Sequence, residues 1–162
     1  MLNKLLFPET KALIEAVGAE NIRFVGGCVR DLVSNLPVND IDFATKLTPE
    51  QMILKCQQHG IKVIPTGIEH GTVTVPIRGW QFEVTTLRKD IKTDGRHASV
   101  EYVDDWEEDA ARRDFTINAF YLSAEGKLTD FFGGMDHIRS GKIVFIGEAE
   151  DRIREDYLRI MR

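Results

Sequence analysis

The sequence predicts an α+β domain whose small, mixed and largely antiparallel sheet is flanked by helices. Segments of strand and helix character follow one another in the order βα-β-α-ββ-α-β, which is neither a regular α/β repeat nor an all-β pattern. The length of 162 residues suits one domain. Apolar residues make up 43% and charged residues 29% of the chain, which is typical of a protein that buries a core.

The first half of the chain carries clear start and stop signals. Gly26-Gly27 closes an apolar run, and Pro37 stops the helical segment that follows. Thr48–Gln51 is a capping box with proline at the first helical position, and Gly60 is the expected stop of this helix. The elements expected here are a helix at 10–17, a strand at Ile22–Val25, a helix from about Val29 to Asn35, a strand at Ile41–Ala44 and a helix from Thr48 to about His59.

The second half is predicted to open with a β-hairpin. Thr72–Ile77 and Gln81–Leu87 alternate in character on either side of Arg78-Gly79. Residues 88–101 are polar and lack periodicity, so we expect a mobile loop there. The elements expected after it are a helix at 104–113, a strand at Ile117–Leu122, a loop at Asp130–Gly134, a strand near Ile143–Phe145 and a final helix from about Glu148.

Composition and charge limit the classes of protein that fit. No apolar run approaches the ~18 residues of a membrane span. The N-terminus lacks the features of a signal peptide, so a cytoplasmic location is predicted. Cys28 and Cys56 have no metal-type spacing and are expected to be buried as small apolar residues. A net charge of −5 is unusual for a domain that grips nucleic acid by itself, so an RNA substrate would need local contacts or another domain.

Basic residues nevertheless cluster at three places along the chain. Each cluster could contact phosphate, and each could also be an ordinary solvated face. The clusters are Arg88, Lys89, Lys92, Arg96 and His97; then Arg112 and Arg113; then Arg152, Arg154, Arg159 and Arg162.

Two sequence features are candidates for phosphate binding. Gly26-Gly27, between a strand and a helix, lets backbone amides approach an anion, and the helix dipole favours that anion. Arg30 in the first helical turn could add a charged contact, although a plain tight turn is an alternative. Arg112 and Arg113, at a helix end before a strand, could bind a triphosphate or simply compensate the helix dipole.

Asp40-Ile41-Asp42 is a candidate metal site. Alternate residues of a strand point to the same face, and two adjacent carboxylates repel each other unless a cation lies between them. Oxygen ligands favour a divalent ion, most simply Mg²⁺. Glu83, in the second hairpin strand, would supply a third carboxylate if its strand neighbours the Asp strand. The alternative for all three residues is a set of solvated carboxylates.

The last helix carries charged residues at helical spacing. Glu155, Arg159 and Arg162 are four and three residues apart and would line one face, with Asp156 beside Arg159. A salt-bridged exposed face is the alternative. A different stripe that can be buried consists of Ile153, Tyr157, Ile160 and Met161.

Taken in order, these motifs closely resemble those of one family. The series GGxVRD, DIDFAT, EVTT, RRDFTINA, DFFGG and GEAExRxxEDxLRxxR runs from about residue 22 to the end. It resembles class II, the bacterial and eukaryotic class, of tRNA nucleotidyltransferases, which belongs to the DNA polymerase beta superfamily and includes bacterial poly(A) polymerases. The resemblance implies a nucleotidyltransferase head that transfers CMP and AMP from CTP and ATP to the 3′-hydroxyl of tRNA and releases pyrophosphate.

The resemblance also implies roles for individual residues. Asp40 and Asp42 match the metal motif, with two Mg²⁺ ions in the catalytic complex, and Glu83 in the matching EVTT motif would complete the catalytic set. The nucleotide-binding residues that it implies are Gly27, Arg30, Arg113, Glu155, Asp156, Arg159 and Arg162. Of these, Glu155, Asp156 and Arg159 would select the incoming base.

The resemblance divides the chain into a head domain at 1–147 and the start of a neck helix at 148–162. Family members continue into neck, body and tail domains, so the chain is expected to be truncated and those parts to supply most tRNA binding. A poly(A) polymerase that adds AMP to RNA 3′ ends shares all the motifs and stays an alternative. An inactive nucleotide- or RNA-binding module is an alternative from another class, and the presence of both Asp40 and Asp42 argues against it.

Overall fold

A seven-stranded sheet forms the centre of the computed structural model, which describes residues 2–91, 99–155 and 157–161. Its strands are β1 (Ile22–Val25), β2 (Asp42–Thr45), β3 (Ile64–Gly67), β4 (Thr72–Ile77), β5 (Trp80–Thr86), β8 (Phe120–Leu122) and β9 (Leu128–Asp130). They lie in the order β3-β4-β5-β2-β1-β8-β9. Only the β2–β5 pair is parallel among these neighbours, so the predicted mixed, largely antiparallel sheet is confirmed.

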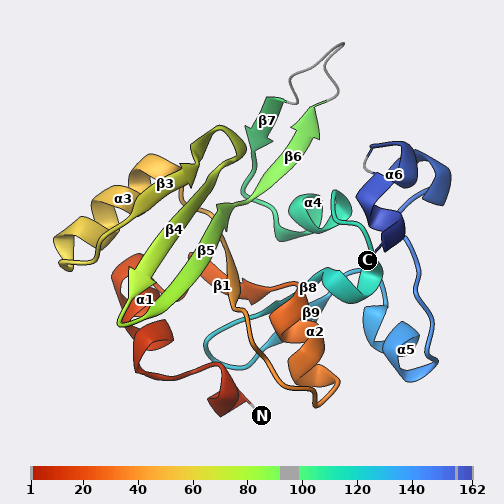
Figure 1. Ribbon diagram of the computed structural model, residues 1–162, viewed down its shortest axis with the longest axis horizontal. Helices are drawn as coiled ribbons and strands as arrows, with labels where there is room; N and C mark the ends of the chain where they lie inside the picture. The colour runs from red at the N-terminus through yellow and green to blue at the C-terminus, as the bar shows by residue number, and fades with distance from the viewer. Residues whose placement is uncertain (1, 92–98, 156, 162) are drawn as a thin grey trace.

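Helices pack against this sheet, as predicted (Figure 1). The described α-helices are α1 (Pro8–Val17), α2 (Gly27–Val33), α3 (Pro49–Gln58), α4 (Trp106–Ala111), α5 (Gly134–Arg139) and α6 (Ala149–Glu155). Short 3-10 turns lie at Leu2–Lys4, Ile68–His70, Thr116–Asn118 and Tyr157–Met161. Among the described residues, no helix is long and apolar enough to cross a membrane.

The sheet separates two apolar clusters, because successive residues of a strand point to opposite faces. The larger cluster joins α1, α2 and α3 to β1 and β2, where the rings of Phe24 and Phe43 lie 4.6 Å apart. Cys28 and Cys56 are buried in it, as expected. The smaller cluster joins α4 to the other face, chiefly through Trp106.

Local signals in the first half of the chain placed its elements well. The amide of Gln51 donates to Thr48 Oγ1 at 3.4 Å, and the amide of Thr48 donates to Gln51 Oε1 at 3.0 Å, so the predicted capping box begins α3. The hairpin of β4 and β5 turns where Ile77 pairs with Trp80. Both predictions are confirmed. Each element depends on contacts between residues a few positions apart, and such contacts can be read from the sequence.

Two predicted loops contain regular structure instead. The prediction of a mobile loop at 88–101 is wrong for the described part of that segment. There β6 (Arg88–Ile91) pairs with β7 (Ser99–Tyr102) in a second sheet. Residues 92–98 lie outside the described residues. A two-stranded ribbon needs no apolar alternation, so its sequence gave no periodic signal. The predicted loop at Asp130–Gly134 is shorter than expected, because α5 begins at Gly134. The Asp130 carboxylate accepts hydrogen bonds from the amides of Gly134 and Met135, both at 2.9 Å, at the start of that helix.

The predictions for the last third of the chain need three further corrections. The strand at Ile117–Leu122 is reduced to β8, because a 3-10 turn occupies Thr116–Asn118. The strand near residue 144 is only an isolated bridge between Phe115 and Phe145. The final α-helix ends at Glu155, and a 3-10 turn follows it. In that turn the side chains of Tyr157 and Met161, two members of the stripe that could be buried, are 69% and 84% exposed.

Candidate active site

A row of paired residues across the sheet places two carboxylates side by side. Tyr121 pairs with Val25, Val25 with Asp42, and Asp42 with Glu83. Directly paired residues point to the same face, so Asp42 and Glu83 project together from the face that α4 partly covers. The Glu83 strand therefore does neighbour the Asp strand, as the hypothesis of a third carboxylate requires.

Asp40 adds a third negative charge beside this pair. It lies just before the strand rather than within it, since β2 begins at Asp42, so the two aspartates do not share a strand as predicted. Desolvation raises the pKa of Asp42, and the negative charges of Glu83 and Asp40 raise it further, while Arg113 opposes them. Like charges gathered in this way are relieved by a cation.

The carboxylates do not form a complete metal cage by themselves. Within residues 2–91, 99–155 and 157–161, no three His, Cys, Asp or Glu side chains are grouped closely enough to hold an ion. Mg²⁺ is commonly held by only one or two carboxylates together with water and substrate phosphates. The donor set is therefore of the kind that suits Mg²⁺ on a phosphate substrate.

The glycine turn brings two guanidinium groups close to the backbone. Gly26 has a φ of 73°, a conformation that favours glycine, and it leads from β1 into α2. A Cβ added at Gly26 would lie 3.7 Å from Arg113 Nη1, and one at Gly27 would lie 3.6 Å from Arg30 Nη2. Arg30 Nη1 donates to Asn118 Oδ1 at 2.7 Å. The structure thus unites the glycine pair with arginines from two separate motifs.

Arg113 is held in place by a buried network centred on Asp109, whose side chain is 1% exposed. Arg113 Nη2 donates to Asp109 Oδ2 at 3.1 Å, and Arg113 Nε donates to the Tyr121 hydroxyl at 3.1 Å. That hydroxyl donates to Asp109 Oδ2 at 2.6 Å. Asp109 Oδ1 accepts from Arg112 Nε at 2.9 Å and from the backbone amide of Arg88 at 3.1 Å.

The electrostatics of this network keep its ions charged at neutral pH. Burial by itself raises the pKa of Asp109, but the charges of Arg113 and Arg112 and the hydrogen bond from Tyr121 outweigh it, so the pKa lies below its ordinary value. Burial lowers the pKa of Arg113, yet its interactions with Tyr121 and Asp109 raise it overall. Arg113 is therefore a permanently charged and oriented group beside the glycine turn.

Sequence reasoning missed Asp109, Tyr121 and Asn118 as parts of this site. A signal for Asp109 was present, because it precedes Arg112 and Arg113 by three and four residues, the spacing at which helical side chains meet. No local signal indicated Tyr121, because its partners Asp109 and Arg113 lie in or just after α4. Asn118 lies in the RRDFTINA motif, but its contact with Arg30 of α2 is not visible in the sequence.

The predicted base-selecting residues lie in the sequence at and just after the end of α6. Asp156 and Arg162 lie outside the described residues, and Glu155 is the last residue of α6. Arg159 Nη1 donates to the backbone oxygen of Arg152 at 2.8 Å. Because residues 157–161 form a 3-10 turn, the single α-helical face predicted for these charges is not formed there, and their role in base selection stays a prediction.

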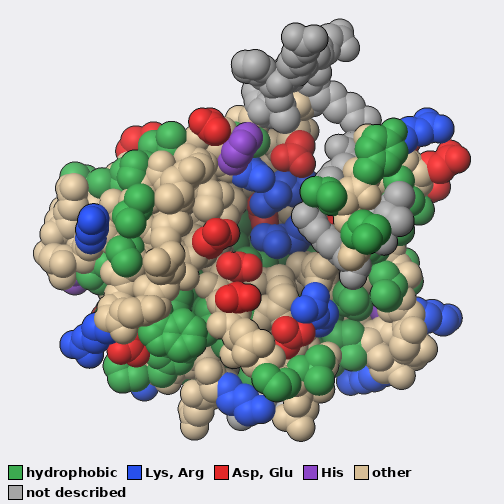
Figure 2. Space-filling model, viewed as in Figure 1, with side chains coloured by type: hydrophobic (Ala, Val, Ile, Leu, Met, Phe, Trp, Pro, Cys, Tyr) green, Lys and Arg blue, Asp and Glu red, His purple; other side chains and the backbone are tan. Residues whose placement is uncertain are grey.

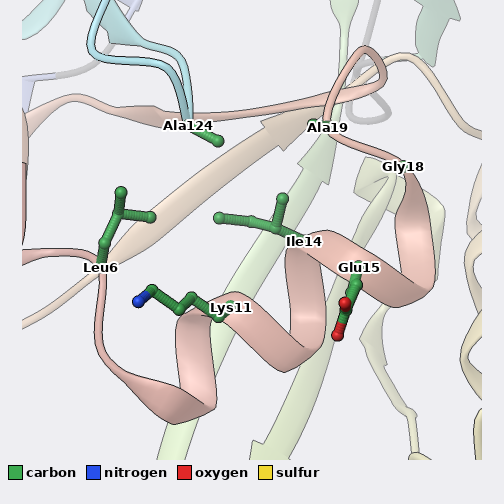
Figure 3. A pocket seen from close by; sticks show the side chains of 7 residues that line it. All are labelled: Leu6, Lys11, Ile14, Glu15, Gly18, Ala19 and Ala124. Atoms are coloured by element: carbon green, nitrogen blue, oxygen red, sulfur yellow. The ribbon is translucent and has the colours of Figure 1, made fainter.

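One face of the molecule gathers both signs of charge in a hollow. Figure 2 shows acidic side chains in the middle of this face with a group of Lys and Arg side chains directly beside them. A different hollow of about 550 Å³ lies beside α1, where mainly apolar side chains face one another (Figure 3). Its lining consists of Leu6, Lys11, Ile14, Glu15, Gly18, Ala19 and Ala124, so it includes no predicted site residue.

Comparison with known proteins gives consistent matches. Residues 22–144 match the family described as the poly A polymerase head domain. The chain is 48% identical over 161 residues to the human mitochondrial CCA tRNA nucleotidyltransferase 1, covering 97% of this chain and 37% of that protein. It is 42% identical over 160 residues to the CCA-adding enzyme of Bacillus cereus strain AH187, covering 96% of this chain and 39% of that enzyme.

A solved structure agrees with the sequence matches. The crystal structure of the Bacillus stearothermophilus CCA-adding enzyme in complex with CTP superposes with a TM-score of 0.81 at 40% identity, covering 97% of this chain and 38% of that chain. The chain therefore spans less than two fifths of the length of the relatives it matches.

Proposed function

The chain belongs to the poly A polymerase head domain family, and we propose that it is the catalytic head of an enzyme that transfers CMP and AMP from CTP and ATP to the 3′-hydroxyl of tRNA. The observation that carries the proposal is the pairing of Asp42 with Glu83 beside a glycine turn that faces Arg30 and Arg113. Acidic groups next to fixed cations suit a substrate that brings both a metal ion and a polyphosphate.

We propose that Asp40 and Asp42 hold Mg²⁺, with two ions in the catalytic complex, and that Glu83 is the third catalytic carboxylate. Burial, and after it the negative charges of Glu83 and Asp40, raise the pKa of Asp42. This supports the role, because a bound cation would relieve the repulsion between the carboxylates. When bound, Mg²⁺ would neutralise charge on the phosphates and favour displacement of pyrophosphate.

The cationic residues would bind and orient the triphosphate. Gly27 leaves room for a phosphate close to the backbone, and Arg30, oriented by Asn118, would donate to its oxygens. Arg113 would stabilise the charge that develops on the leaving group, and the Asp109 network fixes its direction before substrate arrives.

Base selection is assigned to Glu155, Asp156 and Arg159, with Arg162 as a further nucleotide contact. A carboxylate accepts from the exocyclic amine that cytosine and adenine both carry, and a guanidinium donates to the adjacent ring nitrogen. Uracil and guanine present a carbonyl in place of that amine, at a cost of about 1–3 kcal/mol. We expect Asp156→Ala and Arg159→Ala to lose discrimination against UTP and GTP while keeping some transfer. Wild-type selectivity in both variants would exclude this assignment.

A poly(A) polymerase is the second candidate, favoured by the description of the matching family. Incubation of the full-length protein with labelled CTP and ATP and a tRNA that lacks its CCA end separates the candidates. Addition of CMP residues followed by one AMP supports the first function, and long tails of AMP alone support the second. Absence of transfer by the wild-type protein supports the inactive binding module instead.

The catalytic assignment has its own test in the same assay. Asp40→Ala and Asp42→Ala should abolish transfer with the fold intact, whereas Asp136→Ala, an exposed aspartate of α5, should not affect it. Near-normal turnover in either of the first two variants is incompatible with the metal assignment.

The proposed partners are CTP, ATP and the tRNA 3′ end. We propose a head at 1–147 and the start of a neck at 148–162. We expect this chain alone to grip tRNA weakly, because its net charge is −5. Submicromolar tRNA affinity of this chain at physiological salt would contradict that expectation. The cytoplasmic location stays a prediction, since the relatives include a mitochondrial protein and bacterial enzymes.

A further inference from the structure

The guanidinium of Arg88 is a cation beside this site that the proposed mechanism does not use. Arg88 is the first residue of β6, and its side chain is 18% exposed. Its Nε and Nη1 atoms are buried and have no hydrogen-bond partner. The carboxylate of Asp90 lies 4.0 Å from Nε, at the outer limit of an ion pair. Buried charged donors without acceptors are costly, so their retention calls for an explanation.

The neighbouring carboxylate is already occupied by other donors. Asp109 accepts from the side chains of Arg112, Arg113 and Tyr121, and from Arg88 it accepts only the backbone amide. The Arg88 guanidinium interacts electrostatically with Asp109 and with both neighbouring arginines, so three guanidinium groups lie near one buried carboxylate and leave a local excess of positive charge. A packing role for Arg88 would place its nitrogen atoms on protein acceptors, and this arrangement does not.

The place of Arg88 points to the kind of ligand that would supply those acceptors. The network that holds its backbone also holds Arg113, which lies over the glycine turn proposed for nucleotide binding. Figure 2 shows Lys and Arg side chains in the hollow next to the acidic group, on the same face. We therefore expect an extended, multiply charged anion that binds at the carboxylates and at Arg113 to contact Arg88 and Arg112 as well.

We propose that Arg88 binds the terminal phosphates of the nucleoside triphosphate, in a subsite that it forms with Arg112. The proposal rests on the function proposed above and extends it to a residue outside the motifs that predicted the site. Phosphate oxygens provide the acceptors that Nε and Nη1 lack, and a planar guanidinium can contact two of them at once. The phosphates nearer the sugar would stay with Arg30 and Arg113.

The test compares the binding of CMP, CDP, CTP and inorganic tripolyphosphate, each with Mg²⁺, by the wild-type chain and by Arg88→Gln. We expect the variant to bind CTP and tripolyphosphate about ten- to one-hundred-fold more weakly, the equivalent of losing a hydrogen bond to a charged group, and to bind CMP equally well. Lys89→Gln is the matched control, because Lys89 is the next residue, is exposed and pairs with Glu101 at 3.0 Å. It removes the same charge and should leave the whole series unchanged.

Thermal unfolding without ligand separates this role from a structural one. Arg88→Gln removes a buried charge that lacks acceptors and is repelled by Arg112, so we expect its unfolding temperature to rise by roughly 2–4 °C. An arginine kept for stability would give a lower unfolding temperature. Arg88→Lys keeps the charge but loses the planar donor pair, and should recover part of the CTP affinity.

Other outcomes would overturn the proposal. An equal loss of affinity for CMP and CTP in Arg88→Gln would show that the substitution disturbs the whole nucleotide site. Unchanged affinities for all four ligands would show that Arg88 does not contact phosphate. Weaker binding of a short RNA ending in CC, with CTP binding intact, would assign Arg88 to the RNA backbone instead. If the wild-type chain binds no nucleotide, the proposed function fails, and the tripolyphosphate comparison alone then decides whether this phosphate subsite exists.

Discussion

Replacing Asp109 with asparagine should destabilise the protein strongly, although the two side chains have the same shape. The carboxylate is 1% exposed and accepts hydrogen bonds from Arg112, Arg113, Tyr121 and the amide of Arg88. The amide would offer one acceptor and turn two donors toward other donors. It would also leave the nearby guanidinium groups without their counter-ion.

The expected magnitude follows from the loss of a buried ion-pair partner. Breaking such a pair costs about 3–5 kcal/mol, a large part of the roughly 5–15 kcal/mol that stabilises a typical domain. At about 2–4 °C per kcal/mol for a chain of this size, the unfolding temperature should fall by about 6–20 °C. Because the carboxylate is buried, solvent screening should reduce this effect little.

Urea denaturation of wild type, Asp109→Asn and Glu108→Gln would measure the effect on the free energy of unfolding. Glu108 is the exposed neighbour of Asp109 on α4, so its variant is the matched control and should resemble wild type. A loss below about 1 kcal/mol in Asp109→Asn would refute the reasoning, because it would mean that the buried charge is not needed to hold the arginines.

The pH dependence of this difference provides a second check. The pKa of folded Asp109 is below its ordinary value of 3.8, so the carboxylate contributes its stabilisation above that pH and loses it as the pH falls through the lower folded value. The stability difference between wild type and Asp109→Asn should therefore be constant near neutrality and shrink below about pH 3.8. A difference that grows in acid would have the wrong sign.

Three further predictions concern other residues. Asp42→Asn should raise the unfolding temperature in the absence of Mg²⁺, since it removes a repelled charge, and should abolish any stabilisation by Mg²⁺; an unchanged Mg²⁺ response would contradict it. Gly134→Ala should cost about 1–3 kcal/mol in urea denaturation, because its Cβ would lie 2.6 Å from a backbone oxygen, whereas Gly27→Ala meets only ordinary contacts and should cost much less. Asn118→Ala should raise the KM for CTP about fivefold with a smaller change in kcat, because Arg30 loses an orienting bond worth about 1 kcal/mol; a loss confined to kcat would argue against this positioning role.

The fold was most predictable where the determining contacts are local. The capping box at Thr48 and the turn at Arg78-Gly79 bring together residues a few positions apart, and both elements formed as expected. The β6–β7 ribbon escaped prediction because backbone hydrogen bonds stabilise it without an apolar pattern. The start of α5 was missed although its contacts are local: the Asp130 carboxylate, at the end of β9, accepts from the amides of Gly134 and Met135.

The candidate site shows the same division. The kinds of group in the site could be predicted from the sequence. A DxD motif by itself indicates metal binding, and a glycine pair or two adjacent arginines indicate phosphate binding. Their grouping was not readable, because only the sheet order makes Asp42 the neighbour of Glu83. The resemblance to a family supplied that grouping as an expectation and did not include Asp109 or Arg88.

The sequence by itself determined which elements form around local signals, which residues are candidates for binding metal or phosphate, and which family the chain resembles. Tertiary structure alone decided that Asp109 and Tyr121 orient Arg113, and that the side chain of Arg88 lies among cations without acceptors. The physical reason is that hydrogen-bond partners and burial depend on which strands and helices become neighbours. That choice is made by packing over the whole domain, and short-range sequence patterns do not encode it.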